Sequence, residues 1–581
     1  MSAGNGAVRI GNCSGFYGDR LSAMREMLEQ GELDYLTGDY LAELTMLILG
    51  RDTMKDPSLG YARTFVRQVE DTLGLALERG VKIVANAGGL NPAGLAEKLR
   101  EVAKGLGLDA AVAHVEGDDL RAKAADLGFT NALTANAYLG GFGIAAALRG
   151  GADIVVTGRV TDASVVVGPA AFHHGWTPEQ YDELAGAVVA GHVIECGTQA
   201  TGGNFSGFLG LDRTRPLGFP LAEIAADGSS VITKHAGTGG AVTIDTVTAQ
   251  LVYEIQSSRY LNPDVTTHLD SIQLTQAGPD RVAITGVRGE APPAQLKVCV
   301  NELGGWRNSM EILLTGLEID AKEAWVREQL VAGWGDHQPA EVAWARTAPP
   351  VKDPESQELA SCVLRVTVLD PDPKVAGKGF TAPAVETALG SFPGFTLMAP
   401  PSPATPYGIY RPEYVDREVV THTVVHADGT TEVIADPGTY CPPEQRDALV
   451  DQGRRPSPFP APVDQVNRVL PLGTFVHARS GDKGGDANLG LWVSHDDEEK
   501  RAARVTWLTK LITAKKIREL VPEAADLEVD VYSLPNLGAV NVVIRGLLGA
   551  GVAASTRTDP QAKALGEWVR SRHVHIQGEL L

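Results

Sequence analysis

The sequence lacks any excess of positive charge. Its 581 residues include 51 lysines and arginines against 72 aspartates and glutamates, for a formal net charge of -21. We therefore expect neither nucleic acid nor an anionic membrane as a partner, and an anionic ligand must use a local site. No apolar run reaches the ~18 to 20 residues that span a bilayer, and residues 1–6 lack the basic and apolar parts of a signal peptide. These absences predict a cytoplasmic protein.

Cysteine is scarce as well, and two nucleotide-binding motifs are missing. The five cysteines are far apart and show neither CxxC nor zinc-finger spacing, which argues against a disulfide framework and a structural zinc site. No turn matches the dinucleotide fingerprint GxGxxG or the GxxxxGKS/T phosphate loop. We predict no metal and no cofactor.

The chain does contain a regular alternation of elements, and its length suggests roughly three domains. Up to about residue 205, short apolar strands such as 81–85 and 154–156 alternate with polar, glycine-rich turns and amphipathic helices. This alternation predicts an α/β fold built on a mainly parallel sheet with helices on both faces.

Several turns that follow these strands carry polar or glycine residues. The carboxyl ends of parallel strands meet at one edge of a sheet, where open α/β sheets bind ligands. The candidates for substrate binding at this edge are Asn12, Asp39, Asn86, Gly88, Gly89 and Arg159. Asp162 is a candidate for acid/base catalysis, although it could instead pair with Arg159 or cap a helix that begins near residue 163.

The segment 191–205 joins a predicted helix to a loop of small polar residues. Glu195 is a second acid/base candidate, and Thr201 and Asn204 are candidates for substrate binding. His192 and Glu195 could share a helix face as metal ligands, but without a further ligand such a pair is more often structural.

Two cysteines are alternative catalytic candidates, as nucleophiles. Cys13 precedes a helix that is predicted to start at Asp19, and the dipole of a helix favours a thiolate at its N-terminus. Cys196 would need a nearby cation to lower its pKa. Free cysteines are otherwise small buried hydrophobic residues.

Beyond residue 215 the pattern changes. Residues 241–253 are β-rich, and the segments after the proline-rich stretch follow the order of a small ferredoxin-like α/β sandwich. The charged turn 479–486 adds Arg479 and Lys483 as substrate-binding candidates, because backbone donors and cations suit an anion. The expected domains are an α/β strand-turn-helix domain with the site (1–215), a β-rich α+β region (216–440), a linker (441–467) and the terminal sandwich (468–581).

Eight short motifs together resemble the full-length form of the acyclic terpene utilisation AtuA family. They are GNCSGFYGDR at 11–20, DY at 34–35 with YLAE at 40–43, NAGG at 86–89, TGRVTD at 157–162, ECG at 195–197, TGG at 201–203 and RSGDKG at 479–484. The resemblance covers nearly the whole chain, including the C-terminal ferredoxin-like domain. It implies catabolism of terpenoid or branched acids as thioesters, with coenzyme A as part of the substrate.

These features lead to one functional hypothesis and two alternatives. The hypothesis is an enzyme that acts on a branched-chain or terpenoid acyl-CoA by lyase or hydratase chemistry, with Glu195 and Asp162 transferring protons. One alternative is an acyl-CoA thioesterase or acyltransferase with a cysteine nucleophile. The other is a non-catalytic partner subunit of an acyl-CoA carboxylase or related complex. The size of the chain favours a homo-oligomer.

Overall fold

The computed structural model describes residues 6–442 and 467–581. The chain forms a large unit, with the residues up to Asn301, Tyr410–Val552 and Asp559–Leu581, and a small unit, with Glu302–Ile409 and Ala553–Thr558. This division differs from the expected boundaries after 215, 440 and 467, because the C-terminal segment packs on the N-terminal part of the chain. The predicted linker 441–467 lies almost wholly outside the described residues.

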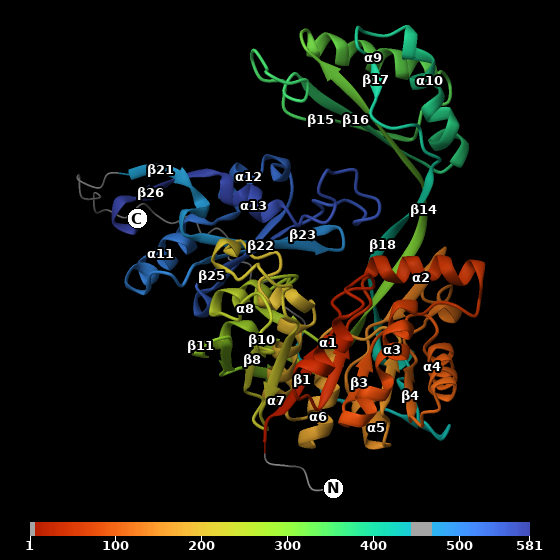
Figure 1. Ribbon diagram of the computed structural model, residues 1–581, viewed down its shortest axis with the longest axis vertical. Coiled ribbons are helices and arrows are strands. Elements are labelled where there is room, and N and C mark those ends of the chain that lie inside the picture. Colours follow the sequence, from red (N-terminus) through yellow and green to blue (C-terminus); the bar gives the residue numbers. More distant parts are fainter. Residues whose placement is uncertain (1–5, 443–466) are drawn as a thin grey trace. The chain divides into compact units, whose positions relative to one another are not determined.

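Five parallel strands form the centre of the large unit (Figure 1). Side chains alternate between the two faces of this sheet: Ile154 and Val156 pack with the helices at 23–30, 63–79 and 92–106, whereas Val155 packs with those at 142–149, 164–174 and 181–194. The strands are β1 (Val8–Asn12), β2 (Tyr35–Gly38), β3 (Lys82–Ala85), β6 (Ile154–Thr157) and β4 (Val112–Glu116), in that spatial order. The helices are α1 (Ala23–Gln30), α2 (Glu43–Lys55), α3 (Arg63–Arg79), α4 (Pro92–Leu106), α5 (Phe142–Arg149), α6 (Ser164–His174) and α7 (Tyr181–Ile194).

Antiparallel strands extend this sheet at both edges, so the mainly parallel sheet expected from the sequence is corrected to a mixed sheet with a parallel centre. Short turns join β7 to β8, β11 to β12 and β19 to β20, and only antiparallel strands can be joined in this way. One edge adds β7 (Pro220–Ile224), β8 (Ser230–Lys234), β12 (Arg281–Thr285) and β11 (Gln273–Gly278), and the other adds β19 (Thr423–Val425) and β20 (Thr431–Val433).

The C-terminal segment forms an antiparallel sheet in the order β22-β23-β25-β24, with helices packed on one face. Leu489, Leu491 and Val542 face these helices, as the α/β sandwich predicted for this segment requires. The elements are β21 (Asn467–Pro471), β22 (Val476–Lys483), β23 (Asp486–Val493), α11 (Glu498–Leu511), α12 (Ala514–Leu520), β24 (Val529–Leu534), β25 (Ala539–Ile544), α13 (Leu565–Ser571) and β26 (His573–Gln577).

The other face of this sheet packs against α8 (Ile244–Leu251) and the turn that follows it. Trp492 Nε1 donates a hydrogen bond to Asp245 Oδ1 at 3.1 Å, and Asn488 Nδ2 donates to Ile255 O at 3.2 Å. The β-rich segment expected at 241–253 is therefore a helix. Its sequence is rich in β-branched residues, but a capping box at its start and burial against the C-terminal sheet favour the helix.

The remaining elements complete both units. Within the large unit, β9 (Arg259–Leu261), β10 (Thr266–His268) and β13 (Arg288–Glu290) form a small sheet. β5 (Ala132–Ala137) pairs with β14 (Gln295–Thr315), which begins in the large unit and continues from Glu302 in the small unit. The small unit contains β15 (Glu341–Arg346), β16 (Ser361–Asp370), β17 (Thr396–Leu397), α9 (Ile319–Trp334) and α10 (Phe380–Glu386), and β18 (Thr405–Asp416) begins there. Among the described residues, no helix is both long and apolar enough to cross a membrane.

Replacing Gly490 with alanine tests the packing of the C-terminal sheet on α8. A Cβ at Gly490 would lie 2.7 Å from Val252 O, inside van der Waals contact. We expect the free energy of unfolding, measured by chemical denaturation, to fall by about 1–3 kcal/mol. Gly210→Ala is the matched control, since no described atom lies within 4 Å of its Cβ position. Equal stability of the two variants would contradict this packing.

Candidate functional site

The turns after the parallel strands meet at one edge of the sheet, as the sequence predicts. Asn86 Nδ2 donates to Asp39 Oδ1 at 2.5 Å, which joins the ends of β3 and β2. Asn12 Nδ2 donates to the backbone oxygens of Ile194 at 2.7 Å and Glu195 at 2.9 Å, which joins β1 to the end of α7. Asn12, Asp39 and Asn86 thus hold this edge together.

Arg159 is a buried cation at this edge, with 2% of its side chain accessible. Its Nη1 donates to Leu41 O at 2.8 Å and to Asp162 Oδ1 at 2.9 Å. The guanidinium carbon lies 4.3 Å from the centroid of the Tyr138 ring. The sequence left two structural roles open for Asp162: pairing with Arg159 and capping α6. Asp162 pairs with Arg159. It does not cap α6, because the N-cap residue of this helix is Ala163 and no side chain caps it.

Asp118 holds the backbone of Arg159. Its Oδ2 accepts the Arg159 N–H at 2.8 Å and a hydrogen bond from Asn136 Nδ2 at 2.7 Å. Burial raises the pKa of Asp118 to about 7. Sequence reasoning missed this residue, because an acidic turn after a strand is too common a signal to single it out.

His192 and Glu195 form a buried pair at the end of α7, with Nδ1 and Oε1 3.0 Å apart. Burial, followed by the charge of Asp162, raises the pKa of Glu195 well above its usual range, and burial lowers the pKa of His192 to about 4. The neutral acid and the neutral imidazole are therefore the favoured forms. His192 Nε2 and Glu195 Oε2 have no hydrogen-bond partner within the described ranges.

Further carboxyl groups lie around Glu195. Burial raises the pKa of Asp39 well above its usual range, and burial together with the charge of Glu254 raises the pKa of Asp482 to about 7. Glu254 has a left-handed backbone (φ 55°), and its N–H donates to Asn488 Oδ1 of the C-terminal sheet at 2.7 Å. In the part of the chain that the structure describes, no group of three or more His, Cys, Asp or Glu side chains is placed to hold a metal ion.

Asp162 faces a cavity of about 500 Å³. Lys483 reaches the same cavity from the hairpin β22–β23, so the C-terminal segment contributes a cation to a site that the sequence placed in the N-terminal domain. Arg159 and Glu195 lie outside the lining. Arg159 donates a hydrogen bond to Asp162, and the charge of Asp162 contributes to the raised pKa of Glu195. The polar part of the wall contains Tyr138, Thr161, Asp162, Tyr260, Lys297 and Lys483.

Lys297 and Glu43 form a second ion pair beside this cavity, with Nζ 3.7 Å from Oε1. Tyr138 OH donates to the same Glu43 oxygen at 2.8 Å. Burial opposes ionisation of Glu43, but the charges of Lys297 and Arg159 lower its pKa to about 2. Burial also lowers the pKa of Lys297. The sequence motif at 40–43 includes Glu43 but predicted no role for it, and sequence reasoning missed Lys297, which does not follow a parallel strand.

The loop after α7 is fixed to the rest of the large unit. Thr201 Oγ1 donates to Gly218 O at 2.7 Å. Arg479 Nη1 donates to Asn204 O at 2.8 Å, and the Arg479 guanidinium lies 4.3 Å from the centroid of the Tyr253 ring. Thr201, Asn204 and Arg479 thus join the loop to its surroundings, and none of them lines the first cavity.

Gly88 and Gly89 permit close packing at the end of β3. The Gly88 N–H donates to Thr157 O at 2.9 Å, and a Cβ on Gly88 would lie 2.8 Å from Pro92 Cα. Gly89 has a left-handed backbone (φ 54°), which glycine adopts at little cost. Both glycines act through the backbone, outside the cavity lining.

Neither cysteine candidate is favoured as a thiolate. Burial raises the pKa of Cys13 to about 12, and burial and the charge of Glu254 raise the pKa of Cys196 well above its usual range. The helix expected from Asp19 begins at Ala23, because the Asp19 carboxylate accepts backbone N–H groups within its own turn. The start of α1 is therefore ten residues beyond Cys13. Because the effect of a helix dipole falls off within the first turn, the prediction that this dipole favours a thiolate at Cys13 is wrong.

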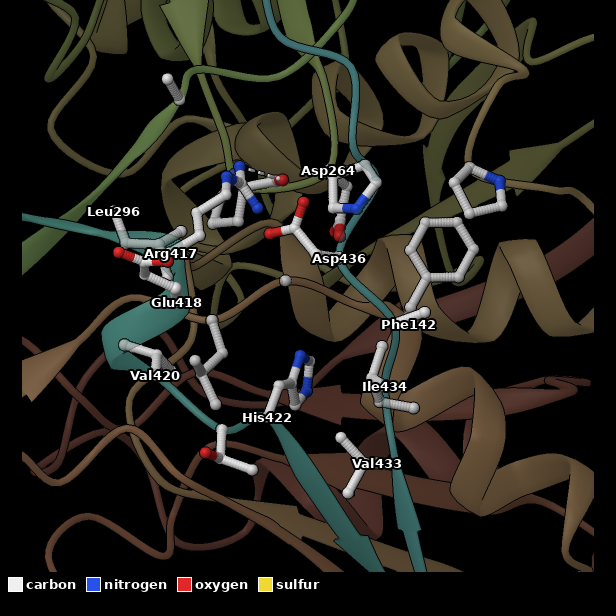
Figure 2. A pocket seen from close by; sticks show the side chains of 18 of the residues that line it. Phe142, Asp264, Leu296, Arg417, Glu418, Val420, His422, Val433, Ile434 and Asp436 are labelled. Carbon is white, nitrogen blue, oxygen red and sulfur yellow. Dashed lines mark hydrogen bonds between the residues drawn. The ribbon is translucent and has the colours of Figure 1, made fainter.

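A second cavity, of about 550 Å³, adjoins the first (Figure 2). The two share Pro263, Ala294, Leu296 and Asp416 in their linings. Figure 2 shows charged side chains at one end, among them Asp264, Arg417 and Asp436, and apolar ones at the other, among them Val420, Val433 and Ile434. The combined lining is therefore polar near Asp162 and partly apolar farther away.

The Glu195→Gln variant tests the buried acid. A carboxyl whose pKa is higher in the folded than in the unfolded state loses stability as the pH rises above about 4.3, its unfolded value. Glutamine removes this loss, so the stability of the variant relative to wild type should increase from pH 4 to pH 8. The increase is about 1.4 kcal/mol per pH unit until Glu195 ionises, measured by urea denaturation. A constant difference, like that expected for the exposed control Glu70→Gln, would contradict the raised pKa.

Comparison with known proteins identifies the family. The family model described as "Acyclic terpene utilisation family protein AtuA" matches residues 8–426, and the model described as "AtuA ferredoxin-like domain" matches residues 470–575. Comparison with curated proteins and with solved structures gave no match. The first match spans the parallel centre and the edge where the candidate residues meet, and the second spans the C-terminal sheet. The chain therefore belongs to the acyclic terpene utilisation AtuA family, in its form with a C-terminal ferredoxin-like domain.

Proposed function

We propose that the protein is a catabolic enzyme that acts on a branched-chain or terpenoid acyl-CoA by lyase or hydratase acid/base chemistry. Family membership supports a role in acyclic terpene utilisation. Coenzyme A as part of the substrate is part of the proposal. The observation that carries the proposal is the first cavity, where Asp162 and Lys483 face the same space and influence the pKa of the buried Glu195. A base, a cation and a protonated acid are thus available in one region.

Asp162 is the proposed base. Its Oδ1 is held by Arg159 at 2.9 Å, and 25% of its side chain is accessible. A fixed carboxylate in a cavity wall can remove the proton next to a thioester carbonyl, and Lys483 can stabilise the charge that develops on the carbonyl oxygen. Arg159 is buried, so we assign it to positioning Asp162.

Glu195 is the proposed acid, since burial raises its pKa well above its usual range and so favours the protonated form. The second cavity supports a branched or terpenoid acyl chain, because it adjoins the space that Asp162 faces and its far end is apolar. Self-association is proposed from chain size alone, and light scattering coupled to gel filtration tests it.

The acid/base roles predict a loss of turnover. With a panel of branched enoyl-CoA and 3-hydroxyacyl-CoA substrates, we expect Asp162→Asn and Glu195→Gln each to lower kcat/KM by about 10²–10⁴-fold. The exposed Glu70→Gln should keep wild-type kinetics. Wild-type rates in both site variants would refute the assignment. No turnover across the panel, together with stable co-purification with an acyl-CoA carboxylase, would favour the non-catalytic alternative.

Serine variants of the two cysteines test the thioesterase or acyltransferase alternative. Because burial raises the pKa of both thiols, we expect Cys13→Ser and Cys196→Ser to turn over the same panel within about threefold of wild type. An acyl-CoA electrophile followed by peptide mapping should label neither cysteine. Stoichiometric labelling of one of them, with loss of turnover in its serine variant, would instead favour a thioesterase or acyltransferase.

A further inference from the structure

Two lysines from distant parts of the chain lie in the wall of the first cavity. Lys297 is near the start of β14, and Lys483 is the last residue of β22. Burial lowers the pKa of Lys297, and the charge of Lys483 acts in the same direction, so the two ammonium groups are close enough to repel each other. Two like charges in one wall are unfavourable unless a negative charge compensates for them.

The contacts of Lys297 fit an ammonium group. Its Nζ lies 3.7 Å from Glu43 Oε1 and 4.8 Å from the centroid of the Tyr138 ring, and both contacts stabilise a positive charge. The distance to Glu43 is beyond hydrogen-bond range, and Nζ donates no hydrogen bond to any residue that the structure describes. With 27% of the side chain accessible, all three N–H donors are available to an acceptor in the cavity.

Lys483 is compensated even less. Within residues 6–442 and 467–581, its Nζ forms neither a hydrogen bond nor an ion pair. Glu43 lies outside the cavity lining, where it accepts the Tyr138 hydroxyl at 2.8 Å. A charge that is partly withdrawn from water costs free energy unless an opposite charge lies beside it. Half-buried Lys483 therefore favours a ligand that brings a negative charge into the cavity.

The other charged side chains of the lining already have partners. They are Arg259, whose Nε donates to Glu290 Oε1 at 2.7 Å, Asp162, which accepts from Arg159 at 2.9 Å, and Asp416, whose Oδ1 accepts from Gln295 at 3.0 Å. Lys297 and Lys483 thus supply the charged donors of this wall that the described residues leave without an acceptor.

We propose that Lys297 and Lys483 form an anion subsite, which binds a carboxylate or phosphate group of the ligand. Both groups present charged oxygen atoms, and hydrogen bonds from an ammonium to such atoms are among the strong ones. The source of the anion rests on the proposed function: a carboxylate would belong to the acyl part of the substrate, and a phosphate to coenzyme A. Because Lys483 has three donors, it can serve this anion and the thioester oxygen together.

A pair of matched thioesters tests the subsite, with affinities measured by titration calorimetry on the full-length chain. Glutaryl-CoA and pentanoyl-CoA differ only in that a carboxylate replaces the terminal methyl group. If the anion is a carboxylate, we expect wild type to bind glutaryl-CoA about 10–100-fold more tightly, and Lys297→Gln and Lys483→Gln to lose this preference. The ratio cancels any effect that the loss of Lys297 has on Glu43, since both complexes share it.

A third ligand identifies a phosphate. If the anion is a phosphate of coenzyme A, wild type should bind the two thioesters equally. Both glutamine variants should then weaken pentanoyl-CoA by about 10–100-fold and leave pentanoyl-pantetheine, which has no phosphate, unchanged. Affinities for all three ligands that are unchanged in both variants would overturn the subsite.

The controls separate the charge from the fold and from the proposed function. The exposed Lys515→Gln should bind every ligand as wild type does, and Lys297→Arg should keep the preference even if Lys297→Gln fails to fold by circular dichroism. Binding of free glutarate or inorganic phosphate that both glutamine variants lose, without turnover of any acyl-CoA, would refute the proposed function alone. Turnover by wild type, with unchanged affinities in the variants, would refute the anion subsite alone.

Discussion

The buried positive charge of Arg159 is the constraint on which the arrangement of this site depends. A guanidinium stays ionised in the protein interior, so every polar group around it must compensate for the loss of water. Leu41 O, the Asp162 carboxylate and the face of Tyr138 do so for the side chain, and Asp118 holds its backbone. Removal of one partner from such a pair costs about 3–5 kcal/mol, which explains why Asp162 has a fixed position at the cavity wall.

The C-terminal sheet is part of the site as well as a separate fold element. Lys483 lies in the cavity wall, and Asn488 accepts the N–H of Glu254, whose left-handed backbone costs about 1–3 kcal/mol when unsupported. The charges of both Lys483 and Glu254 act on the pKa of Glu195. The proton affinity of Glu195, which follows the end of α7, is therefore set partly by Lys483, more than 280 positions away in the chain.

The sequence predicted the parts of the fold that depend on local patterns. Short β-branched runs such as Ile154–Thr157 predicted the parallel strands at the centre of the sheet. The polar turns after these strands predicted that Asp39, Asn86 and Arg159 lie at one edge. Local patterns failed where packing decided the outcome. The pattern of residues 241–253 predicted β structure, yet Ile244–Leu251 form α8, which packs against the C-terminal sheet. The sequence also did not predict that antiparallel strands extend the parallel sheet at both edges.

The sequence by itself determined the family, the parallel centre and the edge at which the candidate side chains meet, because hydrophobic period and strand direction are local properties. Only the tertiary structure decided which of those side chains face a cavity. It placed Asp162 in the wall and Arg159 behind it, and it brought Glu43, Lys297 and Lys483 beside them. Burial and pKa depend on which distant segments exclude water from a group, and no local pattern in the chain encodes that.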